Sequence, residues 1–206
     1  MGRRSDHSRE ELHDLALHAA GRIVGAEGIE ALTARRVASA MGYSPGTLYN
    51  VFADLDDIVI QLNGRTLDDL AGRMAKARRG GDPVTDVLGL LDAYLAFERD
   101  HANLWSALFE HRLSPATTLP PWYLAKIDSA LGLVEAALSP MFPPARDDER
   151  RLAARTLWAS LYGIAALAKS GKLELVTDET GRYMARHMVV NYLAGLARGG
   201  PAPSDA

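Results

Sequence analysis

The chain has 206 residues, of which 48% are hydrophobic, and a formal net charge of −3. This length and apolar content allow a sizeable core, either in one domain of ordinary size or in a small domain fused to a larger one. The net negative charge argues against a protein that coats nucleic acid indiscriminately, but it leaves room for a local DNA-binding face.

Three features of the sequence bear on the cellular compartment of the protein and on whether it enters a membrane. The chain contains no cysteine, so disulfides and thiolate chemistry are excluded, which fits a reducing compartment. The start, MGRRSDHSREEL, is charged and has no apolar segment behind it, so we expect no signal peptide. The longest weakly polar run, Leu157 to Ala168, is too short to cross a bilayer. We therefore expect a cytoplasmic protein with no membrane partner.

The first helix is predicted to begin after Ser8. Glu11 follows three residues later, and this pair forms a capping box. Apolar residues then recur at helical spacing on one face. Gly28 is free to adopt the left-handed conformation and is expected to end the helix.

Two short helices and a longer one are predicted next. Thr33 is the expected N-cap of a helix over residues 34–41, which ends at Gly42. Ser44 is the expected N-cap of a third helix, in which a proline occupies the first position at no cost. Asp54 is expected to cap a long fourth helix.

Breaker residues divide the rest of the chain into further helices. Asp82-Pro83 opens one, a proline pair opens another before Trp122, and a long helix is expected to end near Ser170. Thr177 or Asp178 is expected to begin a last helix, to about residue 198. The pattern predicts an all-α fold of about nine helices. We expect domains over residues 1–53 and 54–198, followed by a flexible tail over 199–206.

The two short helices have the form of a helix-turn-helix. Two helices of about eight residues, joined by a glycine-containing turn and followed by a longer helix, define this motif. Its second short helix lies in the major groove of DNA. Leu48 and Phe52 form the predicted buried side of that helix, which leaves Tyr49 and Asn50 free to reach outward.

The stretch LTARRVASAMGYSPGTLYNVFADLDDIV resembles the DNA-binding domain of TetR-family transcriptional repressors. The resemblance covers about fifty N-terminal residues. It implies an all-α homodimer that binds a palindromic operator in double-stranded DNA and releases it when a small molecule binds. The DNA contacts that it implies are Thr33, Tyr43, Ser44, Pro45, Gly46, Thr47, Tyr49 and Asn50.

The charge of this region departs from the family pattern. Members often carry a basic residue at the position of Pro45 and a lysine at that of Leu55. Residues 1–52 contain six Arg and six acidic residues, so the region is neutral overall. Arg35 and Arg36 make only residues 33–50 locally positive, and we count both as candidate DNA contacts. Because each lost phosphate contact weakens binding, we expect modest affinity per half-site and a requirement for a dimer.

The C-terminal two-thirds is predicted to bind an effector and a second subunit. A Trp-x-x-x-aromatic-Gly pattern around Trp158 is similar to that of one TetR subgroup. Because no cluster of acidic or basic residues stands out among the candidate lining residues, we expect a largely apolar or aromatic effector. The family resemblance implies the ligand cavity itself, and the candidates are Tyr94, Phe97, Trp105, Phe109, Trp122, Trp158 and Tyr162. It also implies a dimer interface on the last two long helices, with candidates Ala159, Gly163, Ala166, Tyr183, His187, Val190 and Asn191.

Two alternatives compete with the regulator hypothesis. Glu98-x-x-His101 and Glu10-x-x-His13 repeat the spacing of di-metal carboxylate bundles. However, the first pair lies at a helix end, where the histidine more simply interacts with the helix dipole. A dimeric helical scaffold that does not bind DNA is the other alternative. No nucleotide-binding or hydrolase motif occurs, so we expect no catalytic residue, no metal and no cofactor.

Overall fold

The computed structural model describes residues 7–77, 80–109, 114 and 117–198. Over these residues the protein contains nine α-helices and no strand, which confirms the predicted all-α fold. The helices are α1 (Arg9–Glu27), α2 (Ala34–Met41), α3 (Pro45–Tyr49), α4 (Leu55–Ala75), α5 (Pro83–Asp100), α6 (Ala102–Phe109), α7 (Pro121–Leu138), α8 (Asp147–Lys169) and α9 (Gly181–Ala197). The tail predicted at 199–206 lies outside the described residues.

Local capping explains where three of these helices begin. Ser8 and Glu11 form the predicted reciprocal capping box at the start of α1. The Thr33 hydroxyl accepts from the backbone N–H of Arg36 at 3.2 Å and caps α2. Asp54 caps the start of α4 by accepting from the N–H of Asp57 at 2.8 Å.

The predicted start of the last helix is wrong by about three residues. Thr177 accepts from the N–H of Glu179 at 3.1 Å, so its hydroxyl stabilises a local turn and not a helix. Thr180 is the N-cap of α9, because its side chain accepts from the N–H of Tyr183. A short 3₁₀ turn, Leu173–Leu175, occupies the preceding connection.

The helices form two compact units. The first contains the described residues up to Asp69 together with Phe97–Lys126, and the second contains Leu70–Ala96 and the described residues from Ile127 onward. Helices α4, α5 and α7 each contribute to both units. The functional boundary predicted between residues 53 and 54 stays a prediction.

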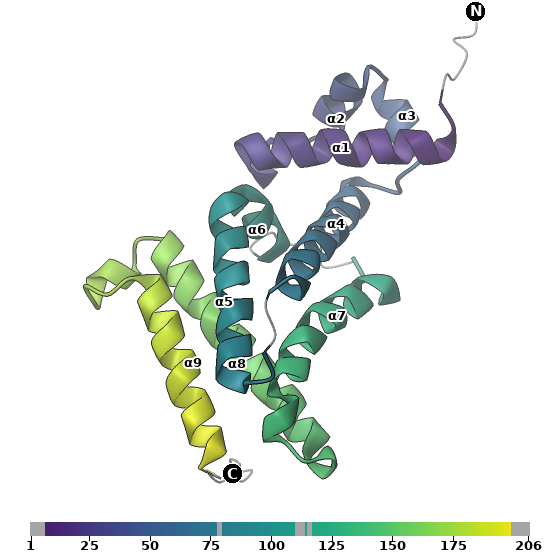
Figure 1. Ribbon diagram of the computed structural model, residues 1–206. Helices are drawn as coiled ribbons and strands as arrows, with labels where there is room; N and C mark the ends of the chain where they lie inside the picture. Colours follow the sequence, from purple (N-terminus) through teal and green to yellow (C-terminus); the bar gives the residue numbers. More distant parts are fainter. Residues whose placement is uncertain (1–6, 78–79, 110–113, 115–116, 199–206) are drawn as a thin grey trace, which may run out of the picture. The chain divides into compact units, whose positions relative to one another are not determined.

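The first unit is built around α1. Helices α2 and α3 lie on the same side of α1 (Figure 1). Their inward residues join α1 and α4 in one apolar cluster, whose fully buried members include Ala16, Ala20, Val24, Val37, Leu48, Phe52 and Ile58. Burial of this apolar face holds the short α3 in place, since a five-residue helix has little stability of its own.

In the second unit α8 packs against α9. The buried residues of these two helices are small or aliphatic, namely Ala153, Ala154, Leu157, Leu161, Ala165, Ala185, Val189 and Leu193. Two ion pairs also join α9 to α5, because Asp92 accepts from Arg182 at 3.1 Å and from Arg186 at 3.0 Å.

Gly42, which ends α2, has a left-handed backbone with φ of 76°. A Cβ there would contact nothing within 4 Å, so the effect of adding one is conformational. We expect Gly42→Ala to lower the free energy of unfolding by about 1 kcal/mol. Chemical denaturation measures this change.

Gly132, inside α7, is the matched control. A Cβ at this position also contacts nothing within 4 Å, and the backbone is helical. Gly132→Ala is therefore expected to raise the free energy of unfolding by about 0.5–1 kcal/mol. If both substitutions change the free energy of unfolding in the same direction, the conformational explanation for Gly42 is contradicted.

Candidate nucleic-acid interface and apolar cavity

The turn between α2 and α3 is fixed by backbone hydrogen bonds. The N–H of Tyr43 donates to the Ala38 carbonyl at 2.9 Å, and that of Gly42 donates to Ser39 at 3.1 Å. Leu48 and Phe52 are each only 1% exposed, whereas Tyr49 is 51% exposed. The side chain of Tyr49 therefore projects away from the core, as the spacing predicts.

The residues from Ser44 to Asn50 present a short polar surface. Ser44, Pro45, Gly46, Tyr49 and Asn50 are exposed, and Thr47 is half-buried. The Ser44 hydroxyl lies 3.2 Å from that of Thr47 and makes no side-chain cap of α3. The two hydroxyls therefore stand next to each other at the start of α3, and the candidate DNA contacts of this segment lie together.

Two other candidate DNA contacts have partners inside the domain. The Tyr43 hydroxyl lies 2.6 Å from Nδ1 of His7, and its ring meets that of His7 edge-on. Thr33 uses its hydroxyl to cap α2. Both side chains therefore have a structural role, whether or not they also contact DNA.

The two candidate arginines differ in their surroundings. Arg36 forms a bidentate ion pair with Glu27 at the end of α1, with N–O distances of 2.5 and 2.9 Å. The hydrogen bond from Arg36 holds the pKa of Glu27 below its usual value, so this carboxylate stays charged. Among the residues that the structure describes, no side chain pairs with Arg35. Arg35 is thus the freer positive charge on α2.

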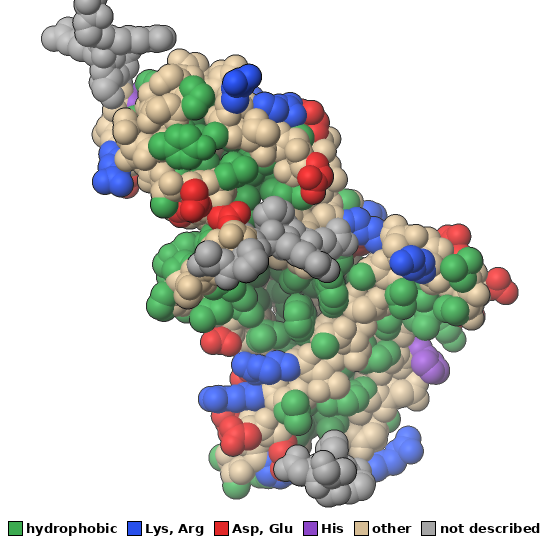
Figure 2. Space-filling model, turned by 180° about the vertical axis from the view of Figure 1, so that it is seen from behind, with side chains coloured by type: hydrophobic (Ala, Val, Ile, Leu, Met, Phe, Trp, Pro, Cys, Tyr) green, Lys and Arg blue, Asp and Glu red, His purple; other side chains and the backbone are tan. Residues whose placement is uncertain are grey.

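Basic and acidic side chains are also mixed over the face of the molecule shown in Figure 2, where blue groups lie beside red ones. This mixture agrees with the formal net charge of −3. The face in Figure 2 therefore carries no broad basic patch, and nucleic acid bound there would depend on a few local contacts.

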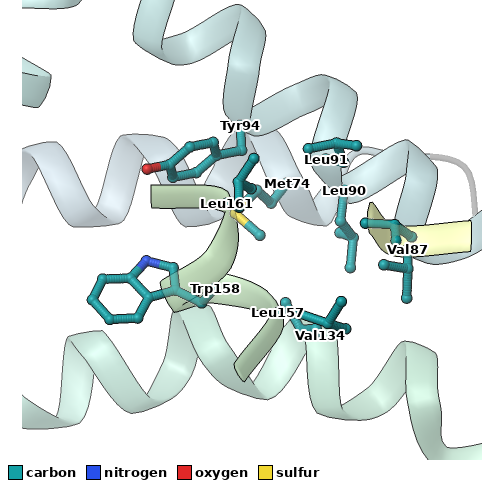
Figure 3. A pocket seen from close by; sticks show the side chains of 10 residues that line it. Met74, Val87, Leu90, Leu91, Tyr94, Val134, Leu157, Trp158 and Leu161 are labelled. Atoms are coloured by element: carbon teal, nitrogen blue, oxygen red, sulfur yellow. The ribbon is translucent and has the colours of Figure 1, made fainter. Parts of the chain in front are cut away.

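An apolar cavity of about 50 Å³ lies within the second unit. Side chains of α5 and α8 point toward each other across it, with Tyr94 and Trp158 at the same end (Figure 3). Its lining residues are Met74, Val87, Leu90, Leu91, Tyr94, Val134, Leu157, Trp158, Leu161 and Val189. Such a lining suits an apolar ligand.

Two of the seven aromatic candidates, Tyr94 and Trp158, line this cavity. Tyr162 stacks on Trp158 with ring centroids 6.1 Å apart and is not a lining residue. The other four belong to the first unit: Phe97 and Trp105 are fully buried there, Phe109 packs on Trp105, and Trp122 is 43% exposed.

Sequence reasoning missed the aliphatic lining residues. They occupy the inward positions of their helices, so their spacing is that of ordinary core residues. Nothing in a single sequence distinguishes a cavity wall from a packed core of the same composition.

The candidate dimer residues form exposed or half-buried surface. Ala159, His187 and Asn191 are exposed, and Gly163 and Ala166 are half-buried. Tyr183 is 56% and Val190 is 44% exposed, whereas Ala185, Val189 and Leu193 of the same helix are buried. This surface of small, apolar and polar side chains is available to a second subunit, and the interface stays a prediction.

Two features are absent from the part of the chain that the structure describes. No group of three or more histidine and carboxylate side chains is placed to hold a metal ion there. No helix in that part is both long and apolar enough to span a membrane.

Two family models match the chain. The model described as "Bacterial regulatory proteins, tetR family" matches residues 16–62, and that described as "Tetracyclin repressor-like, C-terminal domain" matches residues 87–191. An uncharacterised HTH-type transcriptional regulator of Mycobacterium tuberculosis is 26% identical over 173 residues, which cover 84% of this chain and 75% of that protein.

Solved structures show the same fold. A protein of unknown function from Rhodococcus sp. RHA1 superposes with a TM-score of 0.72 at 17% identity, over 95% of this chain and 100% of that one. Thermus thermophilus FadR, a TetR-family transcriptional repressor in complex with lauroyl-CoA, superposes with a TM-score of 0.59 at 18% identity, over 94% of this chain and 99% of that one.

Proposed function

This chain belongs to the TetR family of bacterial transcriptional regulators, and we propose that it is a repressor that binds a palindromic operator as a homodimer. The observation that carries the proposal is the exposed surface of Ser44 to Asn50 on a helix whose opposite side is buried. A regulator of this kind acts on the chromosome, so we place it in the cytoplasm.

The side chains of this surface suit a major groove. The hydroxyls of Thr47 and Tyr49 can donate to phosphate oxygens, and Gly46 has no side chain to hinder close approach of the backbone. The Asn50 amide can bind either a phosphate or the edge of an adenine, where it both donates and accepts. We propose that the hydroxyls hold α3 in position on the phosphates and that Asn50 recognises the base sequence.

A dimer supplies the affinity that one domain lacks. Each subunit contributes one DNA-binding domain, which we call a head. The two heads must lie about one helical turn apart, roughly 34–36 Å, to enter successive major grooves. We propose that α8 and α9 pair with their counterparts in a second subunit. The exposed Tyr183 and Val190 and the small residues Ala159 and Gly163 support this interface.

A small apolar or aromatic effector is proposed to release the operator. The lining of the cavity in the second unit supports this class, and the lauroyl-CoA complex of the distantly related FadR is consistent with it. At about 50 Å³ the cavity must expand to admit a ligand, and the flexible Met74 is suited to move. The effector acts only through a difference in affinity between the two arrangements of the heads.

Thermal stability measured with a series of saturated fatty acids and aromatic hydrocarbons tests this effector class. A binding ligand raises the melting temperature, and it should also release the operator. Val134→Phe, which enlarges one of the lining side chains, should abolish both effects. Ligand binding that is retained in this variant, or that leaves operator affinity unchanged, would contradict the proposal.

The two arginines of α2 are expected to contribute unequally to DNA binding. Arg35→Gln removes one phosphate contact per head, so the plot of log K against log salt for the dimer should become shallower by about 1.8 units. Arg36→Gln should change the slope by less than about half of that, because Glu27 already neutralises this charge. Salt titrations on a selected operator measure both slopes. Equal changes in slope for the two variants would show that the ion pair between Arg36 and Glu27 opens when DNA binds.

A further inference from the structure

A second cavity, of about 220 Å³, lies within the first unit. Residues from α1, α4 and α7 line it, namely His13, Leu17, Gln61, Gly64, Arg65, Asp68, Trp122 and Lys126. In contrast to the apolar cavity, its wall combines ionisable groups with one tryptophan. None of these residues lines the apolar cavity or belongs to the proposed operator surface, although Trp122 is one of the effector-lining candidates from the sequence.

The hydrogen bonds around this cavity leave donors unused. Lys126 Nζ donates to both carboxylate oxygens of Asp68, at 2.6 and 2.5 Å. Arg65 donates to Asp14 through Nη2 alone. Its remaining N–H groups have no acceptor among the residues that the structure describes. The Arg65 bond holds the pKa of Asp14 below its usual value, so both carboxylates already have a cation.

The other polar side chains of the cavity are engaged. Gln61 donates from Nε2 to Asp57 at 2.9 Å, which directs its carbonyl oxygen toward His13 Nε2 at 2.5 Å. The unused donors of the wall are therefore N–H groups, mainly those of Arg65. An acceptor with negative charge is the partner that these groups favour.

Trp122 provides a flat apolar surface beside these donors. It is 43% exposed, and its indole rests on α4 at Gly64. A Cβ added at Gly64 would lie 2.7 Å from Cζ3 of the indole, so the contact requires glycine. A partly exposed tryptophan beside a guanidinium offers stacking and charge in one place.

We propose that this cavity binds a small aromatic carboxylate, with its ring against Trp122 and its carboxylate on the free N–H groups of Arg65. The volume suits a single ring, because a cavity of about 150 Å³ is enough for benzene and a planar carboxylate matches the guanidinium fork. The ligand would also touch His13, which stacks on Phe52 with ring centroids 4.9 Å apart. A second chemical signal could thus act on the DNA-binding helices from inside their own unit.

Calorimetric titration of the full chain with sodium benzoate tests this site without DNA, so its outcome is separate from that of the proposed function. Benzoate should bind at least about tenfold more tightly than acetate, which lacks the ring, and than benzyl alcohol, which lacks the charge. Arg65→Gln should weaken benzoate binding about tenfold or more. Arg99→Gln, which alters an exposed arginine that also pairs with a single aspartate, should leave it within about twofold.

Three results would overturn the proposal. They are equal affinity for benzoate and acetate, unchanged affinity in Arg65→Gln, and loss of benzoate binding in Val134→Phe, which would place the ligand in the apolar cavity. If Arg65→Gln does not fold, as judged by circular dichroism, Gly64→Ala replaces it. The added Cβ displaces the indole, so benzoate binding should weaken in this variant too, and unchanged binding there would also reject the site.

Discussion

The double substitution Thr47→Ala/Tyr49→Phe is expected to weaken operator binding about a thousandfold. It removes two hydroxyls from each head, four in the dimer, and each lost hydrogen bond costs about 1 kcal/mol. About 4 kcal/mol corresponds to nearly three factors of ten in the dissociation constant. The fold should survive, because Tyr49 is 51% exposed and the Thr47 side chain bonds only to Ser44 among the described residues.

Fluorescence anisotropy of a labelled operator, at one fixed salt concentration, measures this loss. Ser170→Ala is the control, since it removes an exposed hydroxyl at the end of α8, in the other compact unit. It should bind the operator like the unmodified protein. If the double variant binds within about threefold of the unmodified protein, these hydroxyls are not at the DNA surface.

Leu48→Ala is expected to lower the free energy of unfolding by about 2–5 kcal/mol. The Leu48 side chain is 1% exposed and belongs to the apolar cluster that holds α3 against α1 and α4. Its truncation removes buried apolar contacts and leaves a cavity that this close-packed cluster can only partly refill.

Leu175→Ala is the matched control for Leu48→Ala. Leu175 is 81% exposed, so the same chemical change should alter the free energy of unfolding by less than about 0.5 kcal/mol. Denaturant titrations at equal protein concentration compare the two, because the stability of a dimer depends on concentration. Similar effects from both substitutions would mean that the α3 cluster contributes little to stability.

The helix-turn-helix could be predicted from sequence because its signals are local. The cap at Thr33, the left-handed glycine at 42 and the proline at the start of α3 act within a few residues. The burial of Leu48 and Phe52 followed from their spacing alone. These short-range rules also account for the correct number of helices over the described residues.

The rest depends on tertiary contacts. The pairing of Arg36 with Glu27 joins two helices through a turn, and the bond between His7 and Tyr43 spans 36 residues. Neither contact has a sequence pattern of its own. Phe97 and Trp105, two of the aromatic cavity candidates, are fully buried in the first unit and are not among the residues that line the apolar cavity. Aromatic side chains fill cores as readily as they line cavities.

The central claim is tested most directly by selecting the sequences that the protein binds from random duplex DNA. We expect enrichment of a palindrome with half-sites about one helical turn apart, bound by two subunits and not enriched by the Thr47→Ala/Tyr49→Phe variant. No enriched sequence, even at low salt where phosphate contacts are strongest, would contradict the assignment of the Ser44 to Asn50 surface to an operator.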